Sequence, residues 1–208
     1  MAIIHSYIVR YDSGFAPNPF YGFCTLATCK PDIRKHAQVG DWVVGTGSKQ
    51  INRGGHLVYA MQVAETLSFE AYSSDPRFER KKPHLSGSYK MAAGDNIYEP
   101  TAIRGRWRQL NSYHSKKDGS PNPDHIKRDT SVSRVLISPV SQFVYFGAEG
   151  PLVATELADA GVVFSGRGRK KITDQAVVAD FADWFSSLSA TGYQGRPHDM
   201  LKDLKALK

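Results

Sequence analysis

The sequence predicts a mixed α+β fold with a strand-rich first part and a helical C-terminal extension. Residues 3–11 ("IIHSYIVRY") alternate and are rich in β-branched side chains, which favours a strand. Residues 56–67 ("HLVYAMQVAETL") are apolar on both faces, which is typical of a central strand. Residues 172–192 instead carry apolar side chains at helical spacing. We therefore expect one domain over residues 1–150 and a helical extension over residues 151–208 that packs on it.

Local signals place the elements between these segments. "KPDIRKHAQ" (30–38) favours a short helix, because Pro31 and Asp32 suit a first turn. "DWVVGTG" (41–47) follows a Gly-Asp turn and predicts a strand, and "GSKQINRGGH" predicts a hairpin-like connection. Residues 73–130 contain five prolines and are the least regular part, and loops of this length are usually functional or disordered.

The second part of the chain begins with two predicted strands, "SRVLIS" and "FVYFG". A short helix should follow and end at Gly161. In the last predicted helix, Thr173 is the expected N-cap and Gly192 lies near the C-terminal stop. The apolar stripe of that helix, from Val177 to Leu188, is expected to dock on the core.

Composition indicates an ordinary globular protein, with 41% hydrophobic and 23% charged residues. The start has no basic region followed by a long apolar run, and we expect a cytoplasmic protein without a membrane partner. Cys24 and Cys29 lack a second cysteine pair that would complete a zinc site, so we expect two buried thiols, with a disulfide or a functional thiol as the alternatives. No metal or cofactor is predicted.

The positive charge is concentrated in one part of the chain. Residues 76–128 hold twelve Lys and Arg against five Asp and Glu, while the remaining residues balance and the chain carries a net charge of +7. Aromatic residues occur within this basic segment. Cations that hold phosphate and rings that stack on bases suit a nucleic acid or nucleotide partner, and a solvated basic loop is the alternative.

The stretch "VGDWVVGTGSK" (39–49) looks at first like a phosphate loop. A P-loop needs Lys directly after its last Gly and then Ser or Thr, whereas here Ser48 precedes Lys49. The glycines could let a base approach the strand end closely, or they could accommodate a bulge or bend. Both readings stay open at the level of sequence.

The order of these elements resembles the PUA-like superfamily, in particular its EVE and YTH branch. The resemblance covers roughly residues 3–80 and includes the V-G-D turn, the strand after it and the "AYSSDPRF" segment. It implies a PUA-like (EVE-like) mixed β-barrel with flanking helices. It also implies that Gly47, Ser48 and Lys49 lie at the rim of a pocket for a modified base.

A closer resemblance covers most of residues 5–150. "YIVRYDSGFAPNPFYGFCTLATCKP", "VGDWVVGTGSK", "LVYAMQVAE", "DPRF", "GDNIY", "NSYHS", "RVLIS" and "FVYFG" resemble the nucleotide modification associated domain family of the second type. That family occurs in bacteria and phages, and its name implies a link to modified nucleic-acid bases. It supplies no established catalytic residues for transfer to this chain.

The first functional hypothesis is a binding module for a modified base or nucleotide, in nucleic acid or free. Aromatic side chains would stack on the base, polar side chains would bind its edge, and cations would hold phosphate. A Trp at the start of a strand is also a common core residue. The predicted ligand-binding residues are Arg10, Tyr11, Asp12, Asn18, Phe20, Tyr21, Lys30, Trp42, Gly47, Ser48, Lys49, Asp95, Asn96 and His114.

The second hypothesis is an enzyme, a hydrolase or transferase, that acts on a modified nucleotide. His114 would be the base with Asp95 or Asp129 as its partner, and Lys30 or Arg104 would stabilise developing charge. His125 and Asp129 are also spaced for one helical turn. A third hypothesis is an adaptor whose basic loop and tail helix bind another protein. The sequence does not indicate an oligomeric state.

Overall fold

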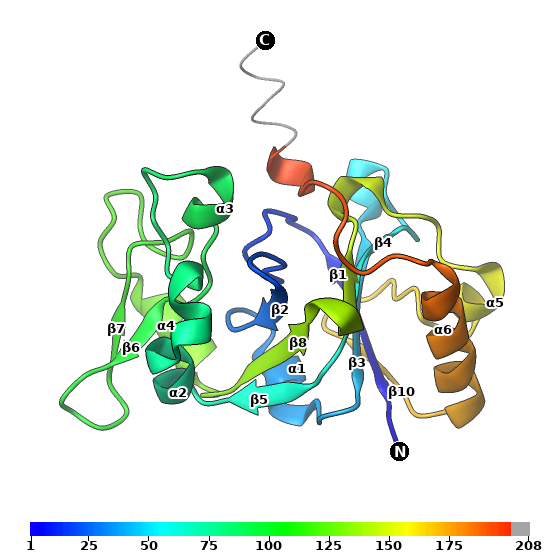
Figure 1. Ribbon diagram of the computed structural model, residues 1–208, viewed down its shortest axis with the longest axis horizontal. Helices are drawn as coiled ribbons and strands as arrows, with labels where there is room; N and C mark the ends of the chain where they lie inside the picture. The colour runs from blue at the N-terminus through cyan, green and yellow to red at the C-terminus, as the bar shows by residue number, and fades with distance from the viewer. Residues whose placement is uncertain (201–208) are drawn as a thin grey trace, which may run out of the picture. The chain divides into compact units, whose positions relative to one another are not determined.

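A computed structural model describes residues 1–200 of the chain (Figure 1). The chain forms two compact units, each built from separate segments. Unit 1 consists of Met1–Ser13, Ala37–Ala64 and the residues from Ser138 onward, and unit 2 consists of Gly14–His36 and Glu65–Ile137. The chain therefore leaves unit 1 twice to build unit 2, and this division differs from the predicted boundary at residue 150.

Unit 1 contains a six-stranded mixed sheet with the order β10-β1-β3-β4-β9-β11. Its strands are β1 (Ile4–Val9), β3 (Trp42–Gly47), β4 (Leu57–Gln62), β9 (Phe143–Tyr145), β10 (Lys170–Ile172) and β11 (Gly192–Tyr193). The pairs β1/β3 and β9/β11 are parallel and the other pairs are antiparallel. Parallel neighbours need a long connection, and the β1–β3 connection carries the first segment of unit 2.

Two helices, α5 (Thr155–Asp159) and α6 (Gln175–Ser187), contribute to the core of unit 1 (Figure 1). Trp42 packs against the rings of Phe181 and Phe185 at centroid distances of 5.3 and 4.7 Å. Side chains of α6 therefore lie in the core of unit 1, and Trp42 belongs to the same core. The helix begins one residue later than expected, because Asp174 rather than Thr173 accepts the capping bond from Ala176 N.

Unit 2 has smaller sheets and short helices around its own aromatic core. Its strands are β2 (Phe23–Leu26), β5 (Glu65–Leu67), β6 (Tyr98–Pro100), β7 (Trp107–Gln109) and β8 (Val135–Pro139), in sheets β2-β8-β5 and β6-β7. Its α-helices are α1 (Pro31–His36), α2 (Phe69–Ser74), α3 (Tyr89–Ala92) and α4 (Pro123–Thr130). The region that looked irregular in sequence is thus a chain of short elements, each bounded by prolines or caps.

The α+β prediction is confirmed, and the barrel is not. Over residues 1–200 the strands form open sheets, and none of these sheets closes on itself. The segment expected to be a helical extension also supplies strands, since β10 pairs with β1 and β11 pairs with β9. In β10 and β11 the backbone N–H and C=O groups are satisfied by the neighbouring strands. The spacing of apolar side chains, which predicted a helix, carries no information about this pairing. Within residues 1–200, each helix is too short or too polar to cross a membrane.

The glycines of "GTGS" are explained by closely packed neighbours at a bulge. The register of β3 against β4 shifts between Gly45 and Thr46. A Cβ at Gly45 would overlap the Tyr59 ring, lying 2.6 Å from its Cδ1, and would lie 2.7 Å from a Val9 methyl group. A Cβ at Gly47 would lie 2.7 Å from the Cβ of Arg53. These observations support the bulge reading of both glycines.

We predict that Gly45→Ala destabilises unit 1. Tyr59 is fully buried and cannot move away without disturbing the sheet, so the free energy of unfolding should fall by about 1–3 kcal/mol. Urea denaturation measures this change. Gly54→Ala is the control, because its Cβ would meet only the flexible side chain of Lys49 closely. Equal effects of the two substitutions would contradict the packing explanation.

Candidate active site

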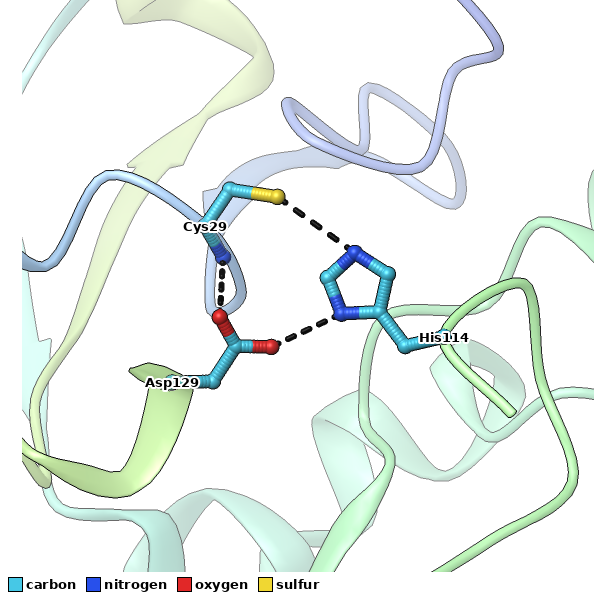
Figure 2. A group of neighbouring side chains, drawn as sticks. All are labelled: Cys29, His114 and Asp129. Carbon is cyan, nitrogen blue, oxygen red and sulfur yellow. Dashed lines mark hydrogen bonds and ion pairs between the residues drawn. The ribbon is translucent and has the colours of Figure 1, made fainter. Parts of the chain in front are cut away.

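Three polar side chains from separate parts of unit 2 meet at one site (Figure 2). Cys29 follows β2 and precedes α1, His114 lies between β7 and α4, and Asp129 lies in the last turn of α4. Figure 2 shows the His114 ring with one nitrogen facing Cys29 and the other facing Asp129. The sequence separations of 85 and 15 residues mean that only the fold brings these groups together.

The distances define a relay from sulfur to carboxylate. Cys29 Sγ lies 3.4 Å from His114 Nε2, and His114 Nδ1 lies 2.7 Å from Asp129 Oδ2. An ionised carboxylate only accepts hydrogen bonds, so Nδ1 carries the proton when the ring is neutral. Nε2 is then the unprotonated nitrogen, and it faces the thiol. This is the arrangement of nucleophile, base and orienting acid found in covalent catalysis.

Asp129 is held as a carboxylate by several donors. Besides His114, it accepts hydrogen bonds from Cys29 N (3.0 Å), the Tyr98 hydroxyl (2.8 Å) and Arg128 Nε (2.9 Å). Burial alone would raise the pKa of Asp129, but the bonds from His114 and Arg128 outweigh it and hold that pKa well below the ordinary value. The bond from Cys29 N also ties the Cys29 backbone to the Asp129 carboxylate.

The backbone at the nucleophile has an unusual conformation. Cys29 and Lys30 have φ angles of 55° and 40°, in the left-handed region that side-chain-bearing residues rarely occupy. Two successive residues of this kind cost energy that the surrounding structure must supply, and such strain concentrates at functional sites. The turn ends β2 and leads into α1, with Pro31 as its first residue.

A buried arginine supports this turn and the end of α4 together. The Arg34 guanidinium, which is fully buried, donates to Cys29 O (2.9 Å) and to Asp129 O (2.6 Å). It also donates to Val132 O (2.5 Å) and Arg134 O (2.9 Å). One planar donor group thus ties the loop that carries Cys29 to the helix that carries Asp129.

The protonation states suit a neutral thiol and a neutral imidazole. Burial raises the pKa of the Cys29 thiol, and Asp129 adds to this rise, while Arg128 and Lys30 act in the opposite direction. Burial lowers the pKa of His114 despite the opposing hydrogen bond to Asp129. The resting site therefore resembles a general-base relay more than a preformed thiolate–imidazolium pair.

Cationic and aromatic groups surround the relay. Arg128 Nη2 lies 3.9 Å from Cys29 Sγ and 3.4 Å from His114 Nε2, and the Arg128 side chain is 41% exposed. The Phe15 ring packs edge-on against His114 and also contacts Tyr113, which is half-exposed. Unit 2 holds sixteen Lys and Arg against ten Asp and Glu, so most of the net charge of +7 belongs to the unit with this site.

Cys29, His114 and Asp129 also include ligand types that hold a metal ion, and one ligand atom of each lies within 4.8 Å of the others. The geometry fits a proton relay better than a metal site, because one nitrogen of the His114 ring faces Cys29 and the other faces Asp129 (Figure 2). Asp129 is already satisfied by four donors, and the Arg128 guanidinium lies beside the sulfur. A cation placed here would meet that positive charge.

The predicted binding residues of unit 2 fall into three environments. His114 is in the relay. Three others, Asn18, Asp95 and Asn96, are buried and hydrogen-bonded. Asn18 accepts a hydrogen bond from Lys81, and Asp95 accepts hydrogen bonds from Thr25 and Tyr72. Asn96 donates to the carbonyls of Tyr72 and Phe78. Phe20 is buried, Tyr21 is half-buried beneath the Arg80 guanidinium, and Lys30 lies in the strained turn.

The predicted binding residues of unit 1 lie on or near the ends of β1 and β3. Arg10 and Tyr11 are exposed, whereas Asp12 is buried and accepts hydrogen bonds from the Tyr145 hydroxyl and His198 N. Burial raises the pKa of Asp12 to about 6 against the effect of those bonds. Trp42 lies in the core, and Gly47 is the last residue of β3. Ser48 caps the following 3₁₀ helix, and Lys49 is exposed. A shared pocket for all these residues stays a prediction.

The structure selects among the acid–base pairs considered from the sequence. Asp129 is the partner of His114, while Asp95 bonds to Thr25 and Tyr72. His125 shares α4 with Asp129, but its Nδ1 lies 2.9 Å from His114 O and its ring packs on the His114 ring. Sequence reasoning assigned Cys29 a structural role and did not select Arg128. Neither Cys29 nor Arg128 belongs to a short sequence motif, so residue spacing did not indicate that either one lies at the site.

We predict that Arg34→Met disrupts the site by leaving buried carbonyl groups without a donor. The free energy of unfolding should fall by at least about 2 kcal/mol, and Arg34→Lys should restore little because an ammonium cannot reproduce the planar fork. Urea denaturation measures both effects. Lys35→Met is the matched control at an exposed neighbour, with an expected change within about 0.5 kcal/mol. An Arg34→Met protein as stable as the parent would contradict the role of Arg34.

Comparison with known proteins gives one result. A family model described as nucleotide modification associated domain 2 matches residues 1–204, nearly the whole chain. No significant match was found among curated proteins or among solved structures. The match spans both units and includes every residue of the relay. The chain therefore belongs to the nucleotide modification associated domain 2 family, whose description links it to modified nucleotides.

Proposed function

We propose that this protein is an enzyme that acts on a modified nucleotide, or on the base it carries, by covalent catalysis at Cys29. The observation that carries the proposal is the relay of Cys29 Sγ, His114 and Asp129 at hydrogen-bonding distances. The family description supports the proposed substrate class, and the relay geometry supports the proposed reaction type. The strained turn at Cys29 supports the assignment, because strained backbone conformations are concentrated at functional sites.

The first step is attack of sulfur on an electrophilic carbon of the substrate. As the S–C bond forms, the thiol proton moves to His114 Nε2, and the electron pair of the attacked double bond moves to its oxygen or nitrogen. The imidazolium that results is stabilised by Asp129, which already holds Nδ1–H. His114 then returns the proton to the leaving group as the electron pair re-forms the double bond. Water in a hydrolase, or another hydroxyl or amine acceptor in a transferase, then attacks the carbon bound to sulfur, the C–S bond breaks, and the proton of the acceptor passes through His114 Nε2 to Cys29 Sγ.

Arg128 is the group that can stabilise the developing negative charge. In acyl-transfer enzymes this is often done by the backbone amide of the nucleophile. Here Cys29 N–H is already donated to Asp129. The Arg128 guanidinium, which lies beside both Sγ and Nε2, is a positive donor at the place where charge would appear. This favours substrates in which an oxygen or a phosphate can approach the guanidinium.

Binding of a modified base, the first hypothesis from the sequence, becomes part of this proposal because an enzyme must hold its substrate. Tyr113, which is exposed and contacts the buried Phe15 ring that packs on His114, offers aromatic surface near the relay, and a ring of this kind can stack on a base. The basic character of unit 2 favours a substrate with phosphate groups. Free nucleotides and nucleic-acid strands share this chemistry and are distinguished by assay.

We predict that Cys29→Ala abolishes turnover of the modified nucleotide or oligonucleotide that the parent protein converts. The loss should be at least about a thousandfold, since the nucleophile is removed. His114→Gln and Asp129→Asn should each cost at least about a hundredfold through loss of the base and of its orientation. Mass-spectrometric analysis of products over a panel of modified substrates provides the measurement, and EDTA should leave the rate unchanged.

Cys24→Ala and His84→Gln are the matched controls for that prediction. Cys24 is the second thiol of the chain and is fully buried, and His84 is an exposed histidine of the same unit. Both variants should keep the rate within a few-fold of the parent, after correction for the folded fraction. Full turnover by Cys29→Ala, with the controls unchanged, would remove the covalent mechanism.

We predict a steep pH dependence for modification of Cys29 by iodoacetamide. Because the thiol pKa is raised and the His114 pKa is lowered, little thiolate exists at neutral pH and the neutral imidazole assists its formation. The alkylation rate should rise from about pH 6 to about pH 9, and His114→Gln should slow it at neutral pH. Peptide mapping should find Cys29 modified and Cys24 protected in the native protein. A rate that stays flat down to about pH 5 would instead indicate a stable thiolate.

A further inference from the structure

A groove lies in unit 1 between α5 and α6, which contain none of the relay residues. Its volume is about 300 Å³. Leu157, Ala160, Val177 and Trp184 contribute its main apolar lining, and Glu156 and Asp180 place carboxylates at it. Both acids are exposed, whereas Leu157 is buried, so the groove has an apolar floor and an acidic rim.

The acidic character of this region contrasts with the rest of the protein. Helices α5 and α6 carry four acidic residues, Glu156, Asp159, Asp180 and Asp183, and their sequences contain no Lys, Arg or His. The chain as a whole has a net charge of +7. An acidic rim repels nucleic acid and nucleotides, so this groove is unsuited to the ligands expected at unit 2.

Trp184 gives the groove an anchor that protein interfaces commonly use. Its ring contacts Phe181 at a centroid distance of 5.8 Å, and the residue remains only partly buried. Partly exposed Trp residues in apolar pockets are frequent energetic centres of protein interfaces. An apolar side chain of a partner would be buried on Trp184, Leu157 and Val177, and nearby cations would face the two carboxylates.

We propose that the groove between α5 and α6 docks a basic, apolar segment of a partner protein. Charge complementarity selects this partner, because Glu156 and Asp180 place two carboxylates at a groove whose other lining residues are apolar. The Lys170 ammonium lies nearby, 3.5 Å from Ala160 O, and leaves the acidic side chains in excess. The inference is independent of the proposed reaction and gives the tail helix a binding role. It also specifies the sign of charge that the partner must carry.

The test uses two synthetic amphipathic peptides, one of leucine and lysine and one of leucine and glutamate. Fluorescence anisotropy measures binding of each labelled peptide to the full chain. The Leu/Lys peptide should bind, and the Leu/Glu peptide should not. The double variant Glu156→Lys/Asp180→Lys should lower affinity for the Leu/Lys peptide by about tenfold or more and should create affinity for the Leu/Glu peptide.

Two further variants make the test specific to the groove. Asp183→Lys changes an exposed acid of α6 that does not line the groove, and it should alter affinity by less than about threefold. Trp184→Ala should weaken binding of the Leu/Lys peptide by about tenfold or more. Circular dichroism checks that this variant is folded. If Trp184→Ala does not fold, the charge-reversal variants still test the proposal.

Several outcomes would overturn the proposal. Failure of the parent chain to bind the Leu/Lys peptide is one. Equal losses in Asp183→Lys and in the double variant would assign the effect to general charge. Dimerisation of the parent chain that depends on Trp184, without peptide binding, would identify a second copy as the occupant.

Discussion

The buried guanidinium of Arg34 is the contact on which the candidate site depends. It donates to the Cys29 carbonyl and the Asp129 carbonyl at once, so neither the loop after β2 nor the end of α4 can shift alone. Burying a cation is costly unless its donors are satisfied, and here four carbonyls satisfy them. The hydrogen bonds of Arg34 stabilise the left-handed turn at Cys29, a backbone conformation that residues with a side chain rarely adopt.

A second buried cation plays a comparable part elsewhere in unit 2. Lys81 Nζ donates to Asn18 Oδ1 (2.6 Å), Asn18 O (3.0 Å) and Phe23 O (3.0 Å). Burial lowers the pKa of Lys81 to about 8, with Asp95 opposing the shift. This unit is therefore organised by satisfied polar groups as well as by its aromatic core, which suits a small unit with short strands.

The two units present different chemistry. Unit 2 combines a thiol, a base, an acid and a cation in one place, on a unit whose charge favours anionic substrates. Unit 1 combines a six-stranded sheet with an acidic, apolar groove between its helices. Catalysis at the first surface and recruitment through the second are separate proposals, and each depends on its own residues.

The sequence by itself determined the α+β class, the main strands of the sheet in unit 1 and the docking of the tail helix. These follow from periodicity, which is a local property. It also indicated His114 and Asp129 as one candidate pair among several. Only the tertiary structure placed Cys29 and Arg128 beside them, showed that the sheets stay open and drew β10 and β11 into the first sheet. The reason is physical: strand pairing, buried ion networks and a relay between residues 85 positions apart depend on contacts that no local pattern encodes.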